Sequence, residues 1–102
     1  MKGLNNHLML NVNRYDEAKR FYGWLLPKVG YPNQTAFAED APKLGSGWYN
    51  DDGSVWVQEA EARFRADQFH RHRVGLCEIA LAADSRRLVD ELATDIGRYG
   101  GS

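Results

Sequence analysis

The sequence has little of what would place it in a specialised class of protein. It contains one cysteine, Cys77, so no disulfide can form within the chain, and a reducing, cytoplasmic setting is expected. No apolar run approaches the ~20 residues that cross a bilayer, and the first residues lack the basic and apolar segments of a signal peptide. The formal net charge is −1, which excludes a general field that would attract nucleic acid or an anionic membrane.

What is present fits one globular domain. Hydrophobic residues make up 43% of the 102 residues, which is enough for a modest core and too much for a disordered chain. No linker or low-complexity segment divides the chain, so residues 1–102 are expected to form a single domain.

Residues 7–12 predict a strand with two different faces, because successive side chains of a strand point to opposite sides. One face is apolar and suited to packing beneath a helix; it consists of Leu8, Leu10 and Val12. The opposite face is mixed and consists of His7, Met9 and Asn11.

An amphipathic helix is expected after this strand. Apolar residues recur there at helical spacing, namely Ala18, Phe21, Tyr22, Leu25, Leu26 and Val29. Asn13 is the expected N-cap, and Pro27 is expected to end the regular helix near Leu26. Gly30 can then take a left-handed turn.

Three short strands are expected to follow, at residues 35–39, 47–50 and 54–60. Residues 51–53 (DDG) predict a hairpin turn between the last two strands, because Asp-Gly is a favoured pair in such turns. In the last strand Val55 and Val57 suit the helix side. That alternation leaves Trp56 and Gln58 on the opposite, mixed face.

The strand-helix pattern returns near the end of the chain. Residues 78–83 (EIALAA) predict a strand, and Asp84 or Ser85 can cap a second helix. The apolar stripe of that helix consists of Val89, Leu92, Ala93 and Ile96. When the two units are superposed in register, Glu78 takes the position of His7, which indicates an internal duplication.

Three segments resemble the vicinal-oxygen-chelate superfamily, the glyoxalase/bleomycin-resistance/dioxygenase fold: HLMLNVNRYDEAKRFYGWLLPKVGY, GSVWVQEA and HRHRVGLCEIALAADSRRLVDEL. The resemblance implies an α+β fold of βαβββ modules, with helices on one face of a curved sheet and a cavity between paired modules. By this comparison module one spans about residues 4–62, a connector 63–74, and an incomplete second module (βα) 75–98. The last three strands of a second module have no counterpart, so we expect that module to be truncated.

Many members of the superfamily bind a divalent metal, and the resemblance assigns three ligands here, His7, Gln58 and Glu78. Glu59 replaces Gln58 if the register shifts by one. Imidazole, amide and carboxylate groups together suit Zn, Mn, Ni or Fe(II). The set lacks the family's fourth ligand, and the alternative is that these are ordinary polar residues on half-exposed strands. Without a metal, Glu78 is the candidate catalytic residue, as a general base on a strand face among alanines.

The candidate ligand-binding residues are Met9, Asn11, Trp48 and Trp56. They would line an apolar pocket on the mixed face, and the alternative for the tryptophans is a place in the hydrophobic core.

Residues 63–73 are rich in arginine and histidine, with Phe64 and Phe69 interleaved, as a nucleic-acid contact would be. Acidic neighbours dilute that charge. We therefore interpret this run as a solvated connector and expect no nucleic-acid partner.

These features lead to one functional hypothesis and two alternatives. The leading hypothesis is binding of a small organic ligand between modules, with metal-assisted lyase, isomerase or dioxygenase chemistry implied by the resemblance. The alternatives are a non-catalytic protein that sequesters a drug or metabolite, and a self-associating remnant without an active cavity. The unfinished module also predicts a homodimer, with residues 78–83 and the helix after them at or beside the interface.

Overall fold

The computed structural model describes residues 6–67, 72, 74 and 81–101 of the chain. Within these residues the elements follow the order β1 (Asn6–Val12), α1 (Tyr15–Lys28), β2 (Asn33–Ala36), β3 (Gly45–Tyr49), β4 (Gly53–Glu59), the 3-10 turn η1 (Ala62–Phe64), α2 (Arg86–Asp95) and the 3-10 turn η2 (Ile96–Tyr99). The predicted α+β class is confirmed, and the first five elements form one βαβββ unit.

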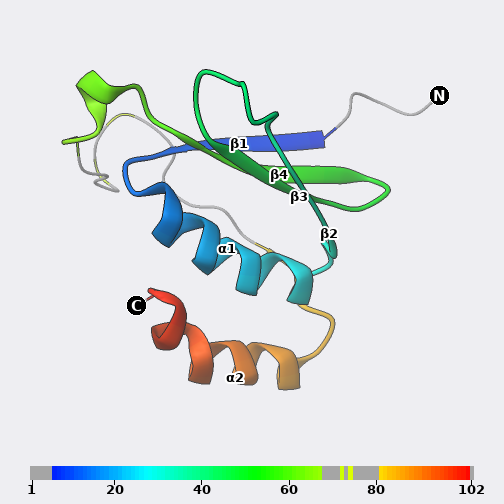
Figure 1. Ribbon diagram of the computed structural model, residues 1–102. Helices are drawn as coiled ribbons and strands as arrows, with labels where there is room; N and C mark the ends of the chain where they lie inside the picture. Colours follow the sequence, from blue (N-terminus) through cyan, green and yellow to red (C-terminus); the bar gives the residue numbers. More distant parts are fainter. Residues whose placement is uncertain (1–5, 68–71, 73, 75–80, 102) are drawn as a thin grey trace.

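The strands of this unit form one curved sheet in the order β1-β4-β3-β2. β3 is antiparallel to both β4 and β2, whereas β1 and β4 are parallel. The register of the parallel pair aligns His7 with Ser54, Met9 with Trp56, and Asn11 with Gln58. α1 packs on one face of the sheet, and α2 lies beyond α1 on that same side (Figure 1).

The core lies between the sheet and α1. Leu26, Trp48, Val55 and Val57 are buried there, and the half-buried apolar face of β1 packs against them. The predicted inward faces of β1 and β4 are therefore confirmed. The one buried polar residue of the described chain, Ser46, forms a hydrogen bond with the hydroxyl of Tyr15.

α1 begins one residue later than a cap at Asn13 would place it. Its N-cap position is Arg14, which makes no capping hydrogen bond through its side chain. The first turn closes through the N–H of Ala18, which donates to the carbonyl of Arg14 over 3.0 Å. The prediction of Asn13 as N-cap was wrong.

α1 also runs past its predicted end, through Pro27 to Lys28. The last turn is closed beyond the proline, because the N–H groups of Val29 and Tyr31 both donate to the carbonyl of Leu26. Gly30 takes the predicted positive φ, 108°, which lets the chain fold back for that second bond.

Each meander strand begins before its predicted start. β2, β3 and β4 start at Asn33, Gly45 and Gly53, because pairing with neighbouring strands overrides the low strand propensity of asparagine and glycine. The predicted hairpin turn joins β3 to β4. Asn50 organises it, since its Oδ1 accepts hydrogen bonds from the N–H groups of Asp52 and Gly53.

The structure does not support the predicted strand at residues 78–83 within its described part. Residues 78–80 lie outside the described residues, and residues 81–83 belong to no strand. The predicted cap at Ser85 is confirmed, because its Oγ accepts a hydrogen bond from the N–H of Leu88 over 3.1 Å.

The apolar stripe of α2 is rotated by about one residue from the predicted one. Leu88, Leu92 and Ile96 are half-buried, whereas Val89 is 51% exposed and Ala93 is exposed. Leu88 thus replaces Val89 on the inner face.

η2 holds the C-terminal segment against α1. The ring of Tyr99 stacks on Trp24 with centroids 4.7 Å apart and planes 5° apart, which leaves Trp24 only 9% exposed. Arg20 adds a hydrogen bond to the carbonyl of Arg98. No helix within the described residues is long and apolar enough to cross a membrane.

Candidate functional site

The face of the sheet opposite α1 carries the mixed side chains expected from the sequence. Alternation along paired strands brings Met9 of β1 next to Trp56 of β4, with His7 beside Ser54. Neither α1 nor α2 covers this face (Figure 1). We refer to it as the open face.

An aromatic platform formed by Trp56 and Phe37 covers part of the open face. Their ring centroids are 5.6 Å apart and their planes differ by 25°. The rings lie flat because β3 presents glycines beneath them. A Cβ atom on Gly47 would come within 2.4 Å of the Trp56 ring, and one on Gly45 within 2.3 Å of the Phe37 ring.

The orientation of the Trp56 indole is fixed by its neighbours. Its Nε1 donates a hydrogen bond to Ser54 Oγ over 3.0 Å, which ties the polar edge of the ring to its own strand. Phe37 is held at the other side, because its N–H donates to the carbonyl of Gly45. The platform is therefore anchored to the sheet by one side-chain and one backbone hydrogen bond.

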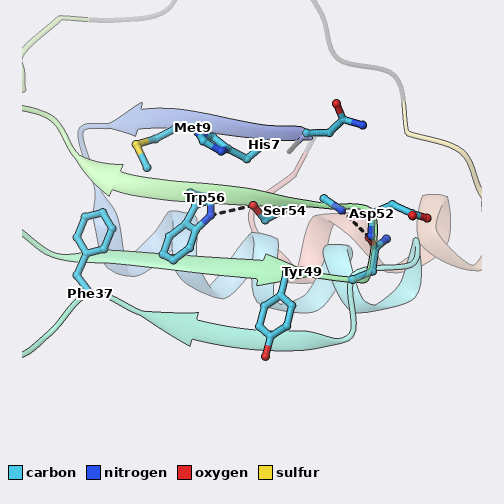
Figure 2. A pocket seen from close by; sticks show the side chains of 10 residues that line it. His7, Met9, Phe37, Tyr49, Asp52, Ser54 and Trp56 are labelled. Carbon is cyan, nitrogen blue, oxygen red and sulfur yellow. Dashed lines mark hydrogen bonds between the residues drawn. The ribbon is translucent and has the colours of Figure 1, made fainter. Parts of the chain in front are cut away.

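A hollow of about 470 Å³ lies over the platform and extends toward the β3–β4 hairpin (Figure 2). Its lining consists of Asn6, His7, Met9, Phe37, Tyr49, Asn50, Asp52, Gly53, Ser54 and Trp56. Met9 and Tyr49 are 41% and 42% exposed, so the hollow opens to solvent and its apolar surface is accessible.

The structure brings together only some of the predicted site residues. Met9 and Trp56 line the hollow, and so does His7. Asn11 and Gln58 lie on the same face beyond it, where Gln58 Nε2 donates to Asn11 Oδ1 over 2.8 Å.

Trp48 belongs to the core and not to the open face. It is 1% exposed, and its ring lies beneath α1, 3.4 Å from where a Cβ on Gly23 would sit. In β3 it pairs with Val55, which also points toward the helix. The prediction that Trp48 lines the pocket was therefore wrong, because side chains alternate along β3 and that of Trp48 points toward the helix.

The predicted metal ligands do not fit one ion on the described residues. His7 pairs with Ser54 and Gln58 pairs with Asn11, so the two candidates are separated by four residues along parallel strands. At about 3.3 Å per residue this is roughly 13 Å, too far for ligands of one metal. Glu78 lies outside the described residues.

Glu59, the alternative to Gln58, is occupied elsewhere. Its Oε1 accepts a hydrogen bond from the N–H of Leu44, and its Oε2 lies 3.5 Å from Arg65. Across the described ranges 6–67, 72, 74 and 81–101, no three or more His, Cys, Asp or Glu residues are grouped so as to hold a metal.

Comparisons with known proteins agree with this architecture. A crystal structure from Bacillus halodurans, provisionally assigned as a glyoxalase, matches 97% of this chain and 71% of its own, with a TM-score of 0.74 and 28% identity. The fold is glyoxalase-like. An uncharacterized protein of Bacillus subtilis (strain 168), YqjT, is 28% identical over 95 residues, which are 93% of this chain and 70% of that protein. No family model matches the sequence.

Several residues that border the hollow were not predicted from the sequence, among them two aromatic residues and one acidic residue. Phe37, Tyr49 and Asp52 line the hollow from outside the predicted faces. No local pattern indicated them, because the neighbouring aromatic residues Trp48 and Tyr49 leave the faces of residues 45–49 (GSGWY) open, and Phe37 and Asp52 lie outside the strands.

Proposed function

We propose that this protein binds a small organic ligand in the hollow on the open face, with one side of the ligand against the platform of Trp56 and Phe37. The half-exposed platform that borders the hollow is the observation that carries the proposal. Ligand sites combine apolar and aromatic surface with a few polar groups, and His7 and Ser54 supply such groups beside the rings.

The glycines beneath the platform support this interpretation over simple packing. A glycine inside a strand costs roughly 0.5–1 kcal/mol relative to alanine, and β3 has two of them under the rings. The core on the other face does not need them, since it is formed by Trp48, Val55 and Val57. A role of the flat, half-exposed rings in ligand binding explains this cost.

Calorimetric titration with quinoline, a neutral planar bicycle, tests the proposal. We expect the wild-type protein to bind quinoline and Trp56→Leu to bind it about five- to 150-fold more weakly, the range that corresponds to base-aromatic stacking of about 1–3 kcal/mol. Phe64→Leu is the matched control, because Phe64 is 48% exposed but lies outside the hollow. Equal affinity in Trp56→Leu, with circular dichroism showing an intact fold, would refute the proposal.

A second candidate function is catalysis of the glyoxalase type on the same face, assisted by a divalent metal. The provisional glyoxalase assignment of the Bacillus halodurans protein favours it. Of the expected ligands only His7 borders the hollow, so a metal would need further ligands from outside the described residues.

Titration with Zn²⁺, Mn²⁺, Ni²⁺ and, without oxygen, Fe²⁺ tests that candidate. His7→Ala should abolish any binding seen in the wild-type protein, because the imidazole would be the strongest neutral ligand of the set. Binding that survives this substitution would remove His7 from the site.

We also propose that the protein forms a homodimer, with the segment 78–83 and α2 at or beside the interface. Leu81 and Val89 support this, because they are 37% and 51% exposed on that part of the chain. A charge introduced at Leu81 should weaken the dimer more than one introduced at Arg65. A monodisperse species of 11.6 kDa in light scattering at micromolar concentration would contradict the dimer.

A further inference from the structure

We infer that the ligand of this hollow is a planar organic cation, an inference that rests on the proposed function of the open face. The charges around the hollow, the internal pairing of four donors at its rim and the half-exposed aromatic rings point to a positive ligand.

Acidic and neutral groups dominate the lining. Of the described residues that border the hollow none is lysine or arginine, and Asp52 contributes an exposed carboxylate. Beyond the far end of β4, Arg63 and Arg65 are already paired with Glu61 and Glu59. No arginine of that cluster is left to attract an anion toward the platform.

Four hydrogen-bond donors that border the hollow, one ring N–H, two backbone N–H groups and one side-chain amide, are already used within the protein. Trp56 Nε1 donates to Ser54 Oγ over 3.0 Å. The N–H groups of Asp52 and Gly53, at 2.7 and 2.9 Å, both donate to Asn50 Oδ1. Asn50 Nδ2 in turn donates to the carbonyl of Gly30. An anion would meet no free donor among these groups, whereas the carboxylate of Asp52 remains available as an acceptor.

The aromatic rings also favour a positively charged ligand. A ring face carries the negative part of the π quadrupole, and a cation above Trp, Tyr or Phe gains roughly 0.5–2 kcal/mol. Phe37 and Trp56 lie along the open face, Tyr49 borders the same hollow, and Asp52 lies at its hairpin end (Figure 2). A flat ligand can therefore stack on the platform while its positive group lies toward Asp52.

Three planar bicyclic compounds of similar size but different charge can be titrated by calorimetry at pH 8. The series separates the effect of ligand charge on affinity from the effect of ligand shape. The cation is N-methylquinolinium, the neutral compound is quinoline, and the anion is 1-naphthoate. We expect N-methylquinolinium to bind roughly tenfold more tightly than quinoline. The anion 1-naphthoate should bind more weakly than both.

Asp52→Asn should weaken the binding of N-methylquinolinium roughly three- to fivefold, as expected for the loss of an exposed ion pair. The affinity for quinoline should be unchanged. Asp51→Asn is the matched control, because it makes the same change in net charge one residue away, outside the lining. Equal losses in the two variants would overturn the role given to Asp52.

The remaining outcomes distinguish a failure of this inference from a failure of the proposed function. Binding of quinoline that depends on Trp56, with no preference for the cation, would overturn the inference and leave the proposed function intact. Tightest binding by 1-naphthoate would also overturn the inference. If none of the three compounds binds, the proposed function fails and the inference fails with it.

Discussion

Replacing Gly47 by alanine should destabilise the protein through a single identifiable clash. The added Cβ would lie 2.4, 2.5 and 2.7 Å from three ring carbons of Trp56. Carbon atoms pack best at about 3.5–4.0 Å, so the indole would have to rise by roughly 1 Å. Such a shift would strain its hydrogen bond to Ser54 and its contact with Phe37.

The expected cost follows from two opposing terms. Overpacking costs about 1–3 kcal/mol, and weakening the hydrogen bond to Ser54 adds about 1 kcal/mol. Replacing a strand glycine by alanine returns roughly 0.5–1 kcal/mol. We therefore expect Gly47→Ala to lower the free energy of unfolding by about 1–3 kcal/mol, measured by urea denaturation followed by circular dichroism.

A double-mutant cycle with Trp56→Leu identifies the clash. In that background the obstructing ring is gone, so Gly47→Ala should be neutral or stabilising by up to about 1 kcal/mol. Gly23→Ala is the control, since its Cβ would meet Trp48 at an ordinary 3.4 Å and alanine favours the helix by about 1 kcal/mol. The same destabilisation by Gly47→Ala in both backgrounds would refute the platform geometry.

Two further predictions concern the helical layer. Tyr99→Ala should remove the ring stacked on Trp24 and cost about 1 kcal/mol locally, so amide hydrogens of α2 should exchange roughly fivefold faster while those of β4 are unchanged. Burial raises the pKa of Tyr22 above its ordinary value of 10.0. The unfolded chain therefore loses this proton first, stability falls as the pH rises above about 10, and Tyr22→Phe should reduce the fall in urea midpoint between pH 9 and 11.

The first half of the fold could be predicted because its patterns are periodic. Leu8, Leu10 and Val12 alternate without interruption, and the structure turns all three toward α1. The same alternation in β4 correctly placed Trp56 on the opposite face of the sheet from Val55 and Val57. Three of the predicted site residues border the hollow on the faces that this rule assigned to them, namely His7, Met9 and Trp56.

β3 could not be placed correctly from sequence because glycine carries no facial signal. The segment GSGWY offers two aromatic neighbours, and only the register with β4 decides which one faces the helix. The structure assigns Trp48 to the core and Tyr49 to the open face. Phe37 reaches the hollow beside Gly45, whose carbonyl accepts its N–H, and Asp52 reaches it from the turn between β3 and β4.

The C-terminal helix shows a different limit of pattern reasoning. Both Leu88 and Val89 are apolar, and their periodicity fits two stripes that differ by one residue. The structure resolves this choice, because Leu88 is half-buried whereas Val89 is 51% exposed. Local periodicity therefore leaves the orientation of α2 open by one residue.

Two substitutions distinguish the contribution of the open face to stability from its contribution to ligand binding. Gly47→Ala disturbs the platform from below and should therefore reduce both stability and quinoline binding. Asp52→Asn alters only an exposed carboxylate, so it should leave the urea midpoint unchanged while reducing the affinity for N-methylquinolinium. If Gly47→Ala lowered stability but left quinoline affinity intact, the platform would be a packing feature of the sheet and the ligand site would lie elsewhere.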